Sequence, residues 1–223
     1  MRQFYLFQKG QPLVDQLSWS HYTIVLSLKN INEINYYIQQ IKKYHWSKRE
    51  LISRIKSKEY ERLDDNTKNK LINNDNTNVL DLVKNSIIIN NKYNLTDIKE
   101  NVLKKLILED IEDFMKELGN GYSFIGSEYK IKIGNTYNYI DILLFNYIYN
   151  CFVVTELKVT ELKKEHIGQI QVYMNYIDEY VKNIYHDKTI GIIIVRKDNK
   201  YIIEYSSDKR IISRVYELVG GNT

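Results

Sequence analysis

Residues 139–173 read YIDILLFNYIYNCFVVTELKVTELKKEHIGQIQVY, and this stretch decides the fold. Apolar and β-branched residues dominate from Tyr139 to Phe145 and again from Cys151 to Val159, and neither Pro nor Gly interrupts the two runs. Beyond them, apolar residues recur at the three- and four-residue spacing of an amphipathic helix. The stretch therefore predicts a strand, a tight reversal, a second strand and then a helix.

Three charged residues stand in the middle of these apolar runs. Side chains alternate along a strand, so Glu156 and Lys158 project to the same side. If the hairpin is centred on Ile148 and Tyr149, Asp141 lies opposite Glu156. Unpaired charges are rarely buried, so either a salt bridge to Lys158 or a bound cation must hold the two acids. Lys158 is the only cation expected in this cluster, and the remaining negative charge suits a divalent metal held by carboxylates, waters and phosphate oxygens.

This arrangement of Asp141, Glu156 and Lys158 on a hairpin followed by a helix resembles the PD-(D/E)XK nuclease superfamily. Five longer segments resemble its bacterial YhcG-type branch: ELGNGYSFIGSEYKIKIGNTYNYIDILLF (117–145), TELKVTELKKEHIGQIQVYMNYIDEY (155–180), TIGIIIVRKDNKYIIEYS (189–206), LSWSHYTIVLSLKN (17–30) and HWSKRELISRIKSKEYERL (45–63). The resemblance covers nearly the whole chain. It implies an α/β fold with a restriction-endonuclease-like core, in which helices flank a mixed β-sheet, preceded by an N-terminal helical region.

The resemblance also implies roles for individual residues. Asp141 and Glu156 would hold Mg²⁺, with Mn²⁺ as the alternative, and Lys158 would act beside them. Gln169 and Tyr173 match a Q-x-x-x-Y element found after the E-x-K strand in some branches, where the Gln orients the site. Two further acids could support the site, Glu109 on the helix before the hairpin and Glu128 on the preceding strand. For Glu109 an ordinary surface acid is the preferred interpretation, and the role of Glu128 is left open. His166 is expected on the surface of the helix.

The chain divides by composition into three segments: a helical region at 1–63, a linker and connecting segment at 64–95, and the nuclease domain at 96–219. Residues 64–78 are polar and Asn-rich, which is typical of a linker. The secondary structure expected in the remainder includes the following elements: an apolar run over 79–94 that could be a helix, one helix from Thr96 to Leu118, a first strand from Phe124 to Ile133, a central strand from Thr189 to Val195, a hairpin partner from Tyr201 to Ser206, a short edge strand from Val215 to Leu218, and a disordered GGNT tail.

Composition limits the compartment and the partners. The chain has 223 residues, a formal net charge of +4 and a single cysteine, Cys151. One cysteine excludes an internal disulfide and favours a reducing compartment, and no apolar run is long enough to span a membrane. We therefore expect a cytoplasmic protein without a membrane partner. The mild positive net charge is compatible with a nucleic-acid partner, although it does not require one.

Basic residues gather on the helix expected after Ser47. They are Lys48, Arg49, Arg54 and Lys56. These residues could contact a nucleic-acid backbone, although the solvated face of a small helical bundle is the preferred interpretation. Apolar Leu51, Ile52 and Ile55 should form the opposite, buried face.

The resemblance, together with the cluster of Asp141, Glu156 and Lys158, implies a metal-dependent nuclease that hydrolyses phosphodiester bonds of nucleic acid, with DNA as the preferred substrate, in bacterial defence, repair or mobile-element maintenance. The alternative is a DNA-binding or complex-forming subunit that keeps the fold without cutting. YhcG-type proteins usually have further sequence before the equivalent of Met1, and MRQFYLF resembles the middle of a helix there, so a truncated start is expected. A homo-oligomer is compatible with the sequence.

Overall fold

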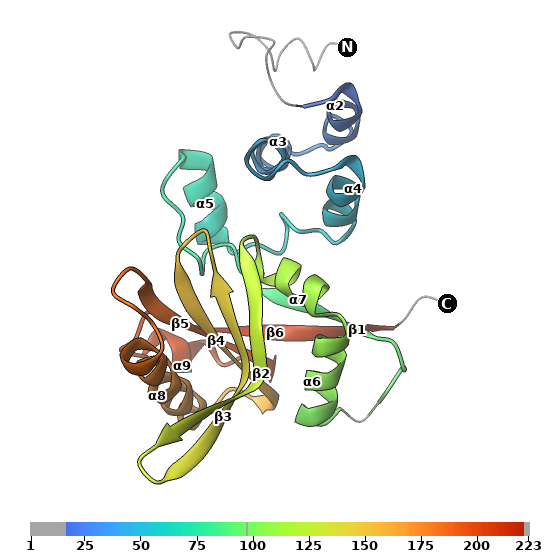
Figure 1. Cartoon of the computed structure of the whole chain (residues 1–223). Coiled ribbons are helices and arrows are strands. Elements are labelled where there is room, and N and C mark those ends of the chain that lie inside the picture. Colours follow the sequence, from blue (N-terminus) through green and yellow to red (C-terminus); the bar gives the residue numbers. More distant parts are fainter. Residues whose placement is uncertain (1–16, 97, 221–223) are drawn as a thin grey trace. The chain divides into compact units, whose positions relative to one another are not determined.

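The computed structural model describes residues 17–96 and 98–220 and divides the chain into two compact units, Met1–Asn76 and Thr77–Thr223. The helix expected at MRQFYLF and the tail at 221–223 lie outside the described residues. No helix within the described ranges is both long and apolar enough to cross a bilayer. Figure 1 shows the elements of both units.

The N-terminal unit is helical, as predicted. Its helices are α2 (Trp19–Val25), α3 (Ile31–Tyr44), α4 (Lys48–Lys56) and α5 (Asp65–Asn73). Helices α3, α4 and α5 begin after Asn30, Ser47 and Asp64, whose side-chain oxygens accept backbone N–H groups of the first turn. Asn, Ser and Asp are among the residue types preferred at this capping position. Leu51 is fully buried in the core of this unit, while Ile52 and Ile55 are only partly covered.

The prediction of a linker at 64–78 is wrong for most of that segment, because α5 occupies residues 65–73. Its polar composition supplies both ends of the helix. Asp64 caps the first turn and Asn74 adopts the left-handed conformation at the last (φ 57°), a role that Asn fills more readily than other non-glycine residues. Leu71 then packs against the helical core, which anchors this mostly polar helix.

The C-terminal unit is built on one mixed sheet, as predicted. Its six strands lie in the order β1-β6-β5-β4-β3-β2. The strands are β1 (Ser86–Asn91), β2 (Tyr122–Ile133), β3 (Thr136–Asn146), β4 (Cys151–Glu161), β5 (Asp187–Lys197) and β6 (Ile211–Gly220). Strands β1, β6, β5 and β4 run parallel, and β4, β3 and β2 are antiparallel.

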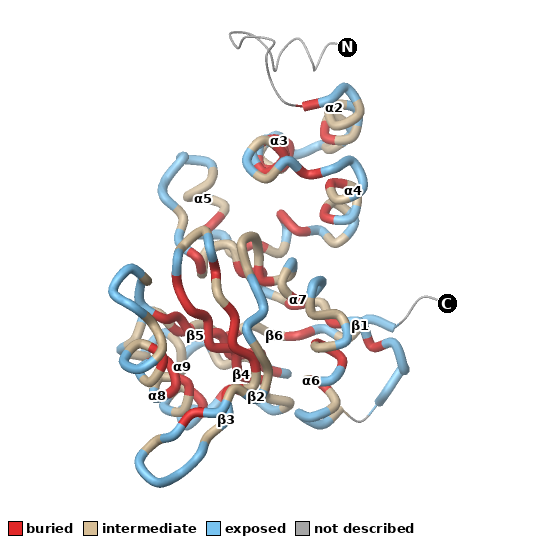
Figure 2. The backbone as a smooth tube through the Cα atoms, in the orientation of Figure 1, coloured by how far each residue is buried: buried red, intermediate tan, exposed pale blue. Residues whose placement is uncertain are grey.

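Helices cover both faces of this sheet. One apolar core lies between the sheet and helices α6 (Glu100–Glu109) and α7 (Ile111–Leu118), and a second lies between the sheet and α8 (Lys164–Tyr180). Alternate residues of β5 enter the two cores, since Ile192 and Ile194 belong to the first while Ile193 and Val195 belong to the second. The predicted central strand is therefore confirmed, and Figure 2 shows the buried middle of the sheet.

In the rest of this unit, one assignment that the sequence leaves open is settled and two expectations are wrong. The apolar run within 79–94 forms the edge strand β1, whose alternating buried residues Ile87 and Ile89 face the core. The segment 201–206 lies mostly in the short helix α9 (Lys200–Glu204), in which adjacent Ile202 and Ile203 both pack against one core, whereas a strand would send them to opposite faces. Strand β6 is an interior strand between β1 and β5, longer than the predicted edge strand.

The prediction of one long helix from Thr96 to Leu118 is also wrong in two respects. It begins at Glu100, with Lys99 as the flanking residue, and it breaks at Asp110 into α6 and α7. Asp110 leaves the helical region (φ −127°, ψ 42°), and its carboxylate lies 2.7 Å from the ammonium of Lys92. The predicted end is correct, because Gly119 takes a positive φ of 126° there.

Candidate active site

The β3–β4 hairpin has the register that the sequence predicts. Its pairs run from Asn146↔Cys151 to Ile142↔Thr155, so one further step along both strands places Asp141 opposite Glu156. The side-chain oxygen of Asn146 accepts the N–H groups of Ile148 and Tyr149 and thereby holds the turn. This turn fixes which residues of the two strands face each other.

Beyond Ile142 the backbone hydrogen bonds between β3 and β4 end. The carboxylates of Asp141 and Glu156 accept backbone N–H groups there instead. The N–H of Asp141 donates to Oε1 of Glu156 at 3.2 Å, and the N–H of Leu157 donates to Oδ2 of Asp141 at 2.9 Å. Each carboxylate is thus anchored to the backbone of the opposite strand. The two side chains converge where the strands separate, and each keeps a second oxygen for another partner.

Those second oxygens face ammonium groups. Oδ1 of Asp141 lies 2.7 Å from Nζ of Lys104 on α6, and Oε2 of Glu156 lies 3.4 Å from Nζ of Lys158. Lys104 also forms an ion pair with Glu128. The expectation that Lys158 is the only cation in this cluster is therefore wrong, because α6 contributes a second one across the sheet face.

The electrostatics follow from burial. Glu156 is only 2% exposed. Burial first, and then the nearby Asp141 carboxylate, raise the pKa of Glu156 to about 7, although Lys158 and the N–H of Asp141 act in the opposite direction. Burial alone would lower the pKa of Lys104, but its hydrogen bonds to Asp141 and Glu128 outweigh burial and raise that pKa. The charged form of Glu156 is therefore disfavoured in the site, whereas the charged form of Lys104 is favoured by its two carboxylate partners.

Glu128 lies in the same row of the sheet. The pairs Ser127↔Ile142 and Tyr129↔Ile140 flank it, which places it across from Asp141 on the neighbouring strand. Its backbone is left-handed (φ 50°), a conformation that costs free energy in a residue other than Gly. The Glu128 side chain is directed to Lys104. In the described part of the chain, no group of three or more His, Cys, Asp or Glu side chains is arranged to hold a metal.

Helix α6 presents Lys104 rather than Glu109 to Asp141. The hydroxyl of Tyr93 donates to the Glu109 carboxylate at 3.0 Å, and Lys105 lies 3.8 Å from the same carboxylate. Glu109 lines an open pocket of about 460 Å³ together with Lys104 and Glu128, so it borders the site without binding Asp141. The sequence does not predict Lys104 as a site residue, because the resemblance implies an acid on this helix. Its position beside buried Leu103 was the available signal.

Gln169 and Tyr173 lie together on α8. Nε2 of Gln169 donates to the Tyr173 hydroxyl at 3.0 Å, and Tyr173 is buried in the α8-side core. The expectation that His166 lies on the helix surface is wrong, since it is buried and its Nδ1 accepts the N–H of Lys163. Burial and the positive charge of Lys158 lower the pKa of His166, which places this ring within electrostatic range of the cluster.

The four basic residues of α4 that could contact nucleic acid differ in their exposure to solvent. Lys48, Arg49 and Lys56 are exposed, but Arg54 is buried. Its guanidinium forms ion pairs with Glu50 at 3.0 Å and with Glu59 at 2.9 Å, and it lies 4.1 Å from the ring centroid of Trp46. The prediction of Arg54 as a contact residue is therefore wrong, because its guanidinium is buried and paired with two carboxylates.

Known proteins resemble the chain in sequence and in structure. "Putative nuclease YhcG" of Escherichia coli K12 is 26% identical over 181 residues, which cover 78% of this chain and 48% of that protein, so the chain spans about half the length of this relative. A repair endonuclease from Pyrococcus abyssi has a TM-score of 0.37 and 17% identity, over 56% of this chain and 49% of the other. A complex of EndoMS with double-stranded DNA has a TM-score of 0.38 and 20% identity, over 59% and 49% of the two chains.

Two families account for most of the sequence. Residues 1–62 match the DUF1016 N-terminal domain, and residues 80–218 match the YhcG PDDEXK nuclease domain. The second match covers more than half of the chain and includes the whole β3–β4 hairpin with Asp141, Glu156 and Lys158. It confirms the predicted superfamily and its mixed α/β fold. The chain belongs to the family of YhcG PDDEXK nuclease domains.

Proposed function

We propose that this protein hydrolyses phosphodiester bonds of nucleic acid, with DNA as the first candidate substrate, and that it uses a divalent cation bound by Asp141 and Glu156. The observation that carries the proposal is the reciprocal anchoring of these two acids. One oxygen of each is fixed to the opposite strand, and the other is left beside an ammonium. Hard carboxylate oxygens are the donors that Mg²⁺ and Mn²⁺ prefer, so the residues fit such a cation.

When bound, the cation supplies a Lewis acid that activates water and offsets charge on the phosphate. Lys158, held 3.4 Å from Glu156, acts as a positive charge toward the phosphate oxygens. Gln169, held by Tyr173, is proposed to position the site rather than to transfer protons. Glu128 keeps Lys104 in place next to Asp141, which sets the charge balance of the cluster.

The test is cleavage of plasmid, linear and branched DNA and of RNA with Mg²⁺ or Mn²⁺. Asp141→Asn, Glu156→Gln and Lys158→Ala should each abolish cleavage while circular dichroism shows an unchanged fold. A matched control is Glu165→Gln, which neutralises an exposed glutamate on α8 and should retain activity. Double variants should lose no more than single ones, because the members of such a site act as one unit. Full activity in Glu156→Gln would contradict the proposal.

One observation favours a second candidate, a binding subunit that keeps the nuclease fold without cutting. The Lys104 ammonium already bridges Asp141 and Glu128, where it neutralises a proposed metal ligand. Calorimetric titration with Mn²⁺ discriminates between the two candidates. Binding that is lost in both Asp141→Asn and Glu156→Gln supports the nuclease, and absence of binding in the parent protein supports the subunit.

A further inference from the structure

Strands β2 and β3 extend well beyond the rest of the sheet. They remain paired out to Ile133↔Thr136, whereas pairing of β3 with β4 ends at Ile142↔Thr155. Residues 129–140 therefore form a two-stranded projection, here termed the β2–β3 ribbon, with a turn at Gly134 (φ 59°). Figure 1 shows it projecting from one end of the sheet, and Figure 2 shows that its tip is exposed.

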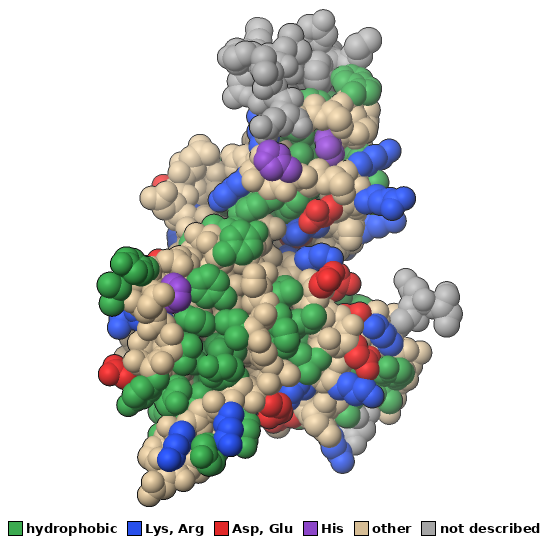
Figure 3. Space-filling view, in the orientation of Figure 1, with side chains coloured by type: hydrophobic (Ala, Val, Ile, Leu, Met, Phe, Trp, Pro, Cys, Tyr) green, Lys and Arg blue, Asp and Glu red, His purple; other side chains and the backbone are tan. Residues whose placement is uncertain are grey.

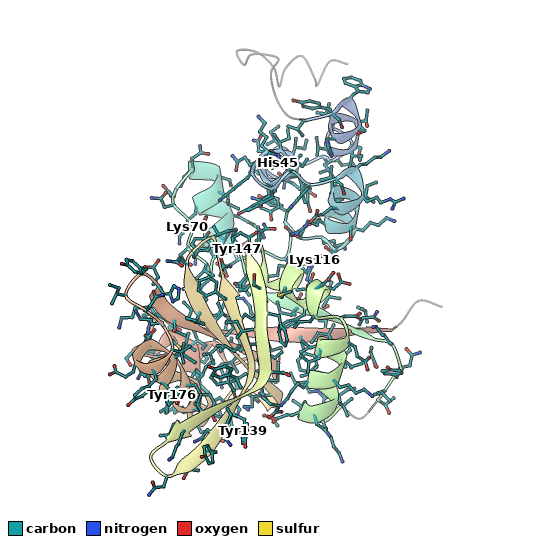
Figure 4. The ribbon with its side chains drawn as sticks, in the orientation of Figure 1. His45, Lys70, Lys116, Tyr139, Tyr147 and Tyr176 are labelled. Atoms are coloured by element: carbon teal, nitrogen blue, oxygen red, sulfur yellow. The ribbon has the colours of Figure 1, made fainter. Side chains whose placement is uncertain are left out.

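The two faces of the ribbon differ in chemistry. Ile131 and Ile140 are buried and contribute to the α8-side core. The opposite face carries the cross-strand pairs Lys130↔Tyr139 and Lys132↔Tyr137. Residues paired across two strands lie on one face, so these four side chains form a single surface. Figure 4 labels Tyr139 on the ribbon.

This outer face is aromatic and positively charged. Tyr137 is 53% exposed and Tyr139 is 48% exposed, and both lysines are exposed. Residues 129–140 contain two lysines and no acidic residue. The Lys130 ammonium lies 3.8 Å from the Tyr137 ring centroid, and neither ribbon lysine forms an ion pair within the described residues. Figure 3 shows basic side chains on this projection beside side chains coloured as hydrophobic, a class that includes Tyr.

The outer face leads into the candidate active site. Tyr139 precedes Asp141 by two residues on β3, and Lys130 follows Glu128 by two residues on β2. Alternation along β3 places Tyr137, Tyr139 and Asp141 on one side of the strand. At about 3.3 Å per residue, the path from Asp141 to Tyr137 is roughly 13 Å, which is the length of a few nucleotides.

We propose that the outer face of the β2–β3 ribbon binds a single-stranded segment of nucleic acid and leads it to Asp141 and Glu156. This inference rests on the proposed function. The two lysines contact phosphates, and the two tyrosine rings stack on bases, which offer their faces only when they are unpaired. Protection of an edge strand against unwanted pairing explains exposed lysines, but it gives no reason for two exposed tyrosines beside them.

The experiment measures binding of the full chain to a fluorescent single-stranded DNA and to its duplex in EDTA at several salt concentrations. Lys130→Gln/Lys132→Gln should weaken single-strand binding and reduce the slope of log K against log salt by about 1.4, since two phosphate contacts are lost. The matched control is Lys188→Gln/Lys209→Gln, which removes two exposed lysines away from the ribbon and should leave the slope unchanged.

The tyrosines give an independent readout. Tyr137→Ser/Tyr139→Ser should weaken single-strand binding by about tenfold or more without changing the salt slope, because stacking involves no counterion release. The matched control removes two other exposed rings, Tyr180 and Tyr185, and should bind normally. Thermal melts should match the parent protein for all four variants, because none of the altered side chains is buried.

Three outcomes would overturn the inference. The first is unchanged single-strand affinity in both ribbon variants, and the second is an equal loss of affinity in the matched controls. The third is a loss of affinity for duplex DNA alone, which would mean that the ribbon binds double-stranded rather than single-stranded DNA. Because binding is measured without metal, the test is independent of cleavage. Asp141→Asn should still bind the single strand, so a protein that binds through the ribbon but never cuts would contradict only the proposed function.

Discussion

Glu156 links charge to stability more directly than any other residue of the candidate site. Its pKa in the folded protein is raised from 4.5 to about 7, mainly by burial. Between these two values the folded protein binds more protons than the unfolded chain, so stability must fall as pH rises through this window. The difference amounts to about 3 kcal/mol at most, at about 1.4 kcal/mol per pH unit.

We therefore expect the metal-free protein to lose stability between about pH 4.5 and pH 7, and Glu156→Gln to remove most of that loss. Urea unfolding in EDTA across this range measures it. Glu165→Gln, which alters an exposed carboxylate, should keep the parent's pH dependence. A parent protein that grows more stable toward pH 7 while Glu156→Gln does not would show that Glu156 is charged and well paired in the folded state.

Lys104 should stabilise the metal-free protein, whereas the buried carboxylate of Glu156 should destabilise it. Its side chain is 15% exposed and neutralises both Asp141 and Glu128, so Lys104→Gln should destabilise the metal-free protein by about 1–2 kcal/mol. The same substitution should tighten Mn²⁺ binding, because the ammonium no longer competes for Oδ1 of Asp141. Chemical unfolding and calorimetric titration measure the two effects.

The neighbouring Lys105 is the matched control for this prediction. It is 69% exposed and lies 3.8 Å from Glu109, so Lys105→Gln should change neither stability nor metal affinity appreciably. Unchanged stability and unchanged metal affinity in Lys104→Gln would mean that this lysine is not part of the charge balance of the site.

At the scale of elements, α8 packs closely on β5, the strand that neighbours β4 of the candidate site. A Cβ at Gly191 of β5 would lie 2.7 Å from Sδ of Met174 and 2.9 Å from Cδ1 of Ile170, both on α8. Gly191→Ala should therefore destabilise the protein by about 1–3 kcal/mol, as overpacking does in a dense core. Gly168→Ala on α8 meets no atom within 4 Å and should stabilise the helix slightly. Thermal melts of the two variants should shift in opposite directions.

At the scale of the whole molecule, tertiary structure decides which basic side chains are exposed and can therefore contact a polyanion such as nucleic acid. Arg54 and Arg49 lie on the same short helix, yet only Arg49 is exposed. Arg54→Gln should destabilise the protein by about 3–5 kcal/mol, because Glu59, which is 3% exposed, loses its buried ion pair. Arg49→Gln should leave unfolding unchanged. Equal stability of the two variants in urea would show that the buried pair contributes nothing.

The sequence alone determined the β3–β4 hairpin, its register and the meeting of Asp141 with Glu156, because alternation along a strand and the symmetry of a tight turn are local rules. It also determined the central strand at β5 and the helical character of the first unit. The edge strand β1, the helix α9 and the break at Asp110 followed from packing between distant segments. Short apolar runs do not distinguish strand from helix until a partner covers them. The arrival of Lys104 beside Asp141 and the burial of Arg54 were likewise decided only by tertiary structure, since the partner of a charged side chain depends on elements that the fold brings together across the chain.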